Sequence, residues 1–197
     1  MTTHQLLDPK QSLALKNVIA GGFAHACERL QKLTGTRVAL HVPTVRWVDV
    51  ESVPFLNSEP ESNHVVVGVR YDGTYGGRAY LIFGEGGASL LSSNLSARSG
   101  LPAPGPEQID VLREVGNIIL TGIVQRIDEL TKCHHEFAVP TFHWGPVRDL
   151  MTIAAEGILL IDSHLEIKNL NLEVIAALTI EPRYLGVFLN SVAGAAA

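Results

Sequence analysis

The sequence predicts an α+β fold in which one layout of helices and strands occurs twice along the chain. Two long segments with helical periodicity, at about 9–34 and 106–132, are each followed by runs of aliphatic residues bounded by turn residues. Each long segment leads into a short predicted strand that ends in Val-Pro, and the two prolines, Pro43 and Pro140, lie 97 residues apart. Helices that cover an antiparallel or mixed sheet form an α+β layer arrangement.

The first half, at about 9–97, is predicted to contain a long helix, three strands and a short helix. The predicted elements are a helix at 9–34, a strand at 37–43, strands at 64–71 and 78–83 around a turn at 73–77, and a helix at 87–95. The glycine-rich residues at 84–89 match neither common phosphate-loop pattern, so they predict a tight turn into the short helix.

The second half, at about 106–195, repeats this order. Its predicted elements are a helix at 106–132, a strand at 135–140, strands at 157–165 and 172–178 around a tight turn at Lys168-Asn169, and a helix at 183–192. The Gly- and Pro-rich segment at 96–106 is predicted to connect the halves inside a single domain spanning 1–197. Pseudo-twofold symmetry between the halves is the expected arrangement.

The composition is typical of a folded protein without nucleic-acid or membrane partners. Of 197 residues, 46% are hydrophobic, and the formal net charge of −5 opposes binding to phosphate backbones. The first residues lack the order of a signal peptide, and no apolar run approaches the roughly 18–20 residues that span a bilayer. We therefore expect a soluble, cytoplasmic protein, with its two cysteines as reduced thiols.

A polar stripe on the second long helix is the candidate functional feature. Its members recur at spacings of three and four residues, which places them on one helix face: Asp110, Glu114, Asn117, Thr121, Gln125 and Asp128. Such a stripe is usually only the solvated face of an amphipathic helix. Here it places Asn, a mediocre helix former, in mid-helix, and carries no Lys or Arg between Arg113 and Arg126. These two features favour a functional surface.

At these residues the sequence resembles the CheC/CheX/FliY family of chemotaxis phosphatases. The family pattern is Asp or Ser, three residues, Glu, two residues, Asn, twenty-two residues and Pro. Asp110, Glu114, Asn117 and Pro140 match it at every spacing. Residues 115–118, Val-Gly-Asn-Ile, are also similar to the family's Ile-Gly-Asn-Ile core. The resemblance covers nearly the whole chain and implies a duplicated CheC-like domain.

The resemblance also implies an activity and roles for single residues. The expected reaction is hydrolysis of the aspartyl phosphate of a CheY-like response regulator. Asn117 would position the attacking water, Glu114 would meet a lysine of the regulator, and Asp110 and Thr121 would support partner contact. The Mg²⁺ would belong to the response regulator, and the chain would have no cofactor or metal site of its own.

The first half departs from the family pattern. Counting back from Pro43 places Leu13, Asn17 and Ala20 where the acid, Glu and Asn would stand. This half is therefore expected to lack a site. Two other interpretations stay open: a non-catalytic binding module that docks a CheD-like deamidase or a flagellar switch component, and a homologue that has lost its activity.

Histidines and a cysteine around position 134 raise a metal-site hypothesis. Cys133, His134 and His135 are adjacent, with Glu136 and His143 nearby. In a strand neighbouring side chains alternate between faces, and no pair has the spacing of common zinc ligands. We predict ordinary strand residues here.

Overall fold

The structure is a computed structural model that describes residues 9–48, 63–95, 105–147 and 158–195. Its elements in chain order are α1 (Pro9–Thr34), β1 (Val38–Val48), β2 (His64–Gly73), β3 (Gly77–Gly84), α2 (Glu85–Leu95), α3 (Pro106–Thr131), β4 (His135–Phe137), β5 (Thr141–Gly145), β6 (Ile158–Ile167), β7 (Leu170–Ile180) and α4 (Pro182–Ala195). The predicted α+β class is confirmed. The predicted connection at 96–106 lies outside the described residues except for Gly105 and Pro106.

The described strands form one sheet to which both halves of the chain contribute. Its order is β1-β6-β7-β3-β2, and both β4 and β5 pair with the outer edge of β2. Every pairing is antiparallel. If the two halves exchange places, the same strand order results, read from the opposite edge of the sheet. The equivalent strands β3 and β7 lie side by side at its centre.

The two halves interlock through their first strands. β1 from the first half pairs with β6 of the second, and β4 and β5 from the second half pair with β2 of the first. Each half therefore supplies the edge strand that completes the hairpin of the other. The sequence predicted the duplication but not this exchange of strands.

Both copies carry the same irregularity at the Val-Pro position. In β1, Val42 and Pro43 face Ser163 alone, and in the second copy the three residues at 138–140 face two residues of β2. Each copy thus inserts one extra residue, as in a β-bulge, where the missing N–H of proline is tolerated. The prediction that the strand ends at Val-Pro is wrong for β1, which continues through Pro43 to Val48. In the second copy β4 ends at Phe137, ahead of Val139 and Pro140, and a separate strand, β5, begins at Thr141.

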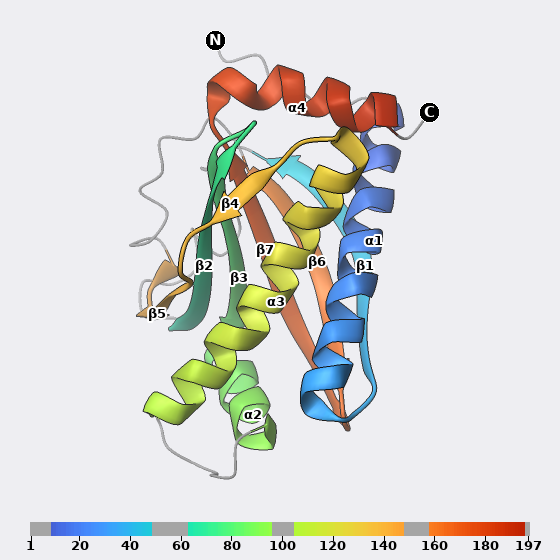
Figure 1. Ribbon diagram of the computed structural model, residues 1–197. Coiled ribbons are helices and arrows are strands. Elements are labelled where there is room, and N and C mark those ends of the chain that lie inside the picture. The colour runs from blue at the N-terminus through green and yellow to red at the C-terminus, as the bar shows by residue number, and fades with distance from the viewer. Residues whose placement is uncertain (1–8, 49–62, 96–104, 148–157, 196–197) are drawn as a thin grey trace.

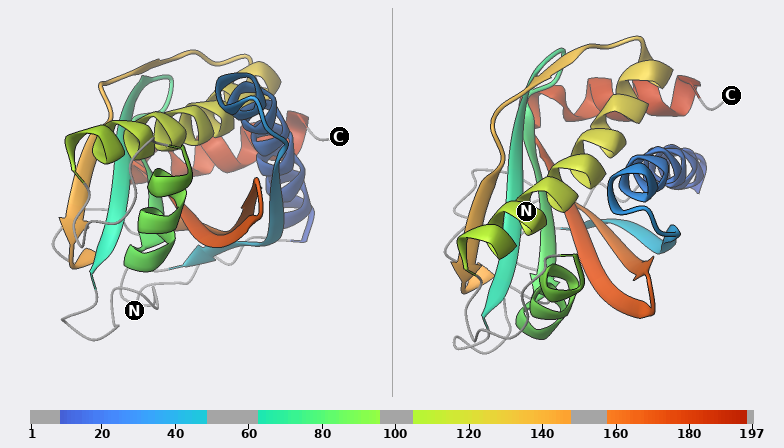
Figure 2. Two further views of the ribbon diagram at one scale, coloured as in Figure 1. Left: turned by 90° about the horizontal axis from the view of Figure 1, so that it is seen from below. Right: turned by 60° about the horizontal axis from the view of Figure 1, so that its bottom comes forward.

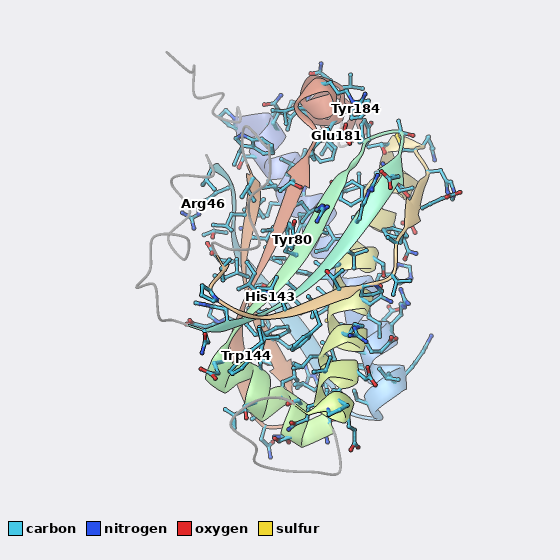
Figure 3. All side chains as sticks on the ribbon, turned by 90° about the vertical axis from the view of Figure 1, so that its left-hand side faces the viewer. Arg46, Tyr80, His143, Trp144, Glu181 and Tyr184 are labelled. Carbon is cyan, nitrogen blue, oxygen red and sulfur yellow. The ribbon has the colours of Figure 1, made fainter. Side chains whose placement is uncertain are left out.

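The main core lies between the sheet and the helices. Helices α1 and α3 cross the same face of the sheet, with α4 across one end and α2 near the other (Figure 1). A smaller apolar cluster on the opposite face includes Val66, Tyr80 and Leu160. Figure 3 labels Tyr80 on β3 and His143 on β5, two strands that flank β2 in the sheet. No described helix combines the length and the apolar character needed to cross a bilayer.

The two long helices touch at glycines. A Cβ atom placed on Gly22 of α1 would lie 2.7 Å from the Cα of Ile123, and one on Gly122 of α3 would lie 3.1 Å from the carbonyl oxygen of Gly22. Without side chains at these positions the backbones of α1 and α3 approach directly. From this crossing the helices diverge toward α2 (Figures 1 and 2).

Candidate functional site

The candidate site is built on α3, a continuous helix with defined ends. The N–H of Gly105 donates to the side-chain oxygen of Gln108 at 3.0 Å, and Pro106 occupies the first helical position, where no N–H is required. At the other end Lys132 adopts a left-handed conformation with φ of 57°. The predicted helix at 106–132 is confirmed, and it is unbroken along the whole polar stripe.

Glu114 and Asn117 lie one helical turn apart on the side of α3 that reaches solvent. The side chain of Glu114 is exposed and that of Asn117 is half-buried. Neither side chain has a hydrogen bond or an ion pair to any described residue. Asp110, one turn earlier, is exposed but forms an ion pair with Arg113 at 3.1 Å between Oδ1 and Nη1. The free carboxylate and the free carboxamide are therefore adjacent.

Thr121 does not share the exposed surface that the sequence predicted for it. It is 6% exposed, and its hydroxyl donates to the carbonyl oxygen of Asn117 at 2.7 Å. Arg29 of α1 reaches the same hydroxyl, with 3.5 Å between Nη1 and Oγ1. The prediction of an exposed contact residue is wrong here because α1 crosses α3 at Gly22 and Gly122 and covers this turn of the stripe.

Asp128, at the far end of the stripe, is engaged inside the protein. One carboxylate oxygen accepts from the backbone N–H of His135 at 3.0 Å, and the other bonds the Nδ1 of the same residue. The Nε2 atom of His135 accepts from the backbone N–H of Tyr75 at 3.1 Å. The imidazole is thereby held as the tautomer with its proton on Nδ1. This pairing does not follow from the polar stripe; its only local signal in the sequence is an Asp in the last helical turn ahead of a strand that begins with His.

Two of the residues considered as metal ligands, His135 and Cys133, have other partners. His135 is occupied by Asp128, and the Sγ of Cys133 lies 3.3 Å from the hydroxyl oxygen of Tyr75. Across the described ranges, no three His, Cys, Asp or Glu side chains are grouped closely enough to hold a metal ion.

The positions of α1 that correspond to the motif carry no acid. Leu13, Asn17 and Ala20 are all exposed, and Leu13 is 61% exposed. They occupy on α1 the places that Asp110, Glu114 and Asn117 occupy on α3, as the 97-residue offset predicts. Pro140, the last member of the pattern, lies between β4 and β5 and belongs to the bulge, not to the exposed stripe.

A groove of about 460 Å³ adjoins Glu114, between the diverging ends of α1 and α3. We call it the α1–α3 groove. Its apolar lining comes from Leu33, Leu95, Val111 and Val115, and its acidic rim from Glu107, Asp110 and Glu114; Thr34 and Lys168 complete it.

The free pair can bind polar and charged groups. A carboxamide donates and accepts hydrogen bonds at once and does not titrate, so it can hold a water molecule and contact an anion together. A carboxylate on the same face favours a cationic group nearby. Both project from a capped helix that packs on a sheet, which holds their relative positions.

Solved structures share this fold. FliY of Thermotoga maritima is 15% identical over 96% of this chain and 98% of its own, with a TM-score of 0.77. The FliM middle domain of H. pylori is 10% identical over 93% of this chain and 99% of its own, at 0.66. CheX of Borrelia burgdorferi, solved with CheY, BeF3 and Mg²⁺, is 16% identical over 81% of this chain and 96% of its own, at 0.53.

The chain therefore has the fold of the CheC/CheX/FliY family, as the resemblance of its motif implied. No protein-family model matches the sequence, and no curated protein does either.

Proposed function

We propose that this protein is a phosphatase of a phosphorylated CheY-like response regulator. The observation that carries the proposal is the pair formed by Glu114 and Asn117. Their side chains lie one turn apart on a continuous helix, reach solvent, and have no partner among the described residues. By contrast, Asp110 and Glu129 on the same helix are paired with arginines.

The proposed reaction is attack of water on the phosphorus of the aspartyl phosphate. The new P–O bond forms as the bond to the aspartyl oxygen breaks, which yields inorganic phosphate and a free aspartate. Phosphoryl transfer needs mainly positioning and electrostatic stabilisation. Asn117 holds the water in line with the leaving oxygen, and Glu114 pairs with a lysine of the regulator and sets the docking register. The Mg²⁺ bound by the regulator supplies the charge that stabilises the phosphoryl oxygens.

A second candidate function is a non-catalytic binding module of the flagellar switch. Two observations favour it: FliY and FliM match this chain with higher TM-scores than CheX does, and α1 has an exposed, uncharged stripe in place of a second site. FliM of H. pylori has been solved in a complex with FliG. In this alternative the α1 stripe of Leu13, Asn17 and Ala20 is the docking surface.

The experiment follows loss of the phosphoryl group from a CheY-like response regulator with and without this protein. The variants are Glu114→Ala and Asn117→Ala, and the matched control is Gln125→Ala, an exposed polar residue farther along the same stripe. We expect the wild type and Gln125→Ala to accelerate the decay equally. Loss of water positioning in Asn117→Ala should lower the rate on the order of 100-fold.

The outcomes separate the two candidates. Full activity in both site variants would refute the assignment of Glu114 and Asn117. Binding of the regulator without faster decay would refute the phosphatase. Binding of a FliG-like protein that Leu13→Lys abolishes, in the absence of any acceleration, would establish the switch-module alternative.

A further inference from the structure

The α1–α3 groove combines an apolar lining with an acidic rim on the surface that carries Glu114. Leu33, in the last turn of α1, is 58% exposed. Exposure of an aliphatic side chain to water is unfavourable in free energy. Across the groove Val111 is half-buried on α3, and Leu95 closes it from the end of α2. The groove therefore presents apolar surface that the described residues leave uncovered.

Carboxylates outnumber cations in the lining of this groove. Glu107, Asp110 and Glu114 line the groove along α3, spaced three and four residues apart, so their carboxylates follow one edge. Asp110 is partly neutralised by Arg113. Lys168 is the cation of the lining, and its ammonium donates to the carbonyl oxygen of Asn94 at 2.5 Å. The rim is thus complementary to a basic partner.

The groove results from the way the long helices pack. Contact at Gly22 and Gly122 brings the middle of α1 onto the second half of α3, so the C-terminal end of α1 and the N-terminal end of α3 diverge (Figures 1 and 2). The hairpin turn at Lys168 and the end of α2 close the lower side. Because glycines set the crossing and the helices are anchored on the sheet, the groove is pre-formed.

We propose that the α1–α3 groove is a second contact area for the response regulator and receives an amphipathic basic helix of that partner. An aliphatic side chain of the helix inserts between Leu33 and Leu95, and its Lys or Arg side chains meet the carboxylates of the rim. Helix-in-groove recognition uses this combination of apolar anchors and flanking charges. The inference rests on the proposed function and extends it, because it separates the residues that hold the partner from Asn117, which acts on the phosphoryl group.

The test measures affinity and turnover separately. The probe is a CheY-like response regulator loaded with BeF3 and Mg²⁺, titrated against wild type, Leu33→Lys and Val187→Lys. Val187 is the matched control because it is an aliphatic residue, 56% exposed, on α4 at the opposite end of the molecule. Lysine suits an exposed helical position, and equal thermal unfolding of the three proteins verifies that each is folded.

We expect Leu33→Lys to weaken binding on the order of tenfold, since it removes an apolar anchor and places a cation against a basic helix. Its turnover of the phosphorylated regulator at saturation should match that of the wild type. Val187→Lys should bind within about twofold of the wild type, and raised ionic strength should weaken wild-type binding.

The experiment tests the proposed groove contact and the proposed phosphatase activity separately. Unchanged affinity in Leu33→Lys, with dephosphorylation intact, would overturn the groove and leave the proposed activity standing. Weakened binding in Leu33→Lys without any dephosphorylation by the wild type would support the groove and refute the activity. Absence of wild-type binding to the loaded regulator would overturn both.

Discussion

Gly116, the residue before Asn117, lies directly against Val67 of β2. A Cβ atom on Gly116 would be 2.6 Å from both the Cβ and the Cγ1 of Val67, closer than such atoms approach in proteins. The helix that carries the candidate site therefore rests on the sheet at the position next to the carboxamide. This contact explains why the motif places glycine before asparagine in mid-helix, although glycine disfavours helices.

Gly116→Ala should displace the part of α3 that carries Asn117. The added methyl group pushes α3 away from β2, and overpacking of this kind costs roughly 1–3 kcal/mol in the free energy of unfolding. Dephosphorylation of the regulator should fall as well, because the shift moves Asn117. Denaturant unfolding and the phosphoryl-decay assay provide the two measurements. In a double-mutant cycle, Val67→Ala should recover part of the loss, and strictly additive effects of the two substitutions would contradict the contact.

Gly22→Ala should weaken the contact between α1 and α3. Its Cβ would meet the backbone of Ile123 at 2.7 Å, and backbone atoms cannot rotate away as a flexible side chain can. We expect a loss of about 1–3 kcal/mol in urea unfolding. The control is Gly186→Ala in α4, where the added Cβ meets nothing within 4 Å, so helix propensity should raise stability by up to about 1 kcal/mol. Equal effects of the two substitutions would show that the helices do not touch at Gly22.

Asp128→Asn should destabilise the protein although it preserves the shape of the side chain. The carboxylate accepts two hydrogen bonds from His135, whose side chain is 1% exposed, and an amide can accept only on its oxygen. Hydrogen bonds to charged groups contribute about 1.5–3 kcal/mol, so a loss near 2 kcal/mol is expected in denaturant unfolding.

The control for this prediction is the neighbouring surface ion pair. Glu129 bonds Arg126 at 2.8 Å, and its side chain is 49% exposed. Because solvent screens such pairs, Glu129→Gln should cost less than about 0.5 kcal/mol. A loss in Asp128→Asn no larger than in Glu129→Gln would contradict a structural role for the buried pair.

Alkaline pH should destabilise the fold through its buried tyrosines. Burial, with smaller contributions from the carboxylates of Asp128 and Glu181, raises the pKa of Tyr71 far above its ordinary value near 10. In the unfolded chain this phenol ionises above about pH 10, whereas in the folded protein it stays neutral. Stability is therefore full below pH 10 and is lost as the pH rises toward the folded pKa.

Tyr71→Phe isolates that contribution. Between pH 10 and 11 ionisation of this phenol in the unfolded chain lowers the free energy of unfolding by about 1 kcal/mol, so the variant should lose less stability over this interval than the wild type. At pH 7 the variant should be about 1 kcal/mol less stable, because the hydroxyl donates to the carbonyl oxygen of Thr179 at 2.8 Å. Urea unfolding at both pH values measures the difference, and equal alkaline losses would contradict the prediction.

Local periodicity predicted the described elements except β5, because it depends on residues that are close together in the sequence. The bounds of α1 and α3, both hairpins and the short helices follow from residue spacing and turn residues, and the structure confirms them within a few positions. The 97-residue offset between Pro43 and Pro140 also predicted equivalent positions, since both copies carry their extra residue there. Glu114 and Asp110 are exposed as the helical spacing predicted.

The solvent exposure of the polar stripe could not be predicted from helical spacing. Spacing places Thr121 and Asp128 on the face of Asn117, and this geometry is correct for an isolated helix. Which part of that face meets solvent depends on α1, which covers Thr121, and on β4, whose His135 takes the carboxylate of Asp128. Neither contact is encoded in the periodicity of α3 itself.

The sequence by itself determined most of the elements, the duplication, and a motif that places an acid and a carboxamide one turn apart. The tertiary structure alone decided that the halves exchange their first strands, that glycines set the crossing of the long helices, and that an acidic, apolar groove opens beside Glu114. The physical reason is the range of the interactions. Propensity and spacing act over a few residues, whereas strand pairing and helix crossing depend on contacts between segments that are distant along the chain.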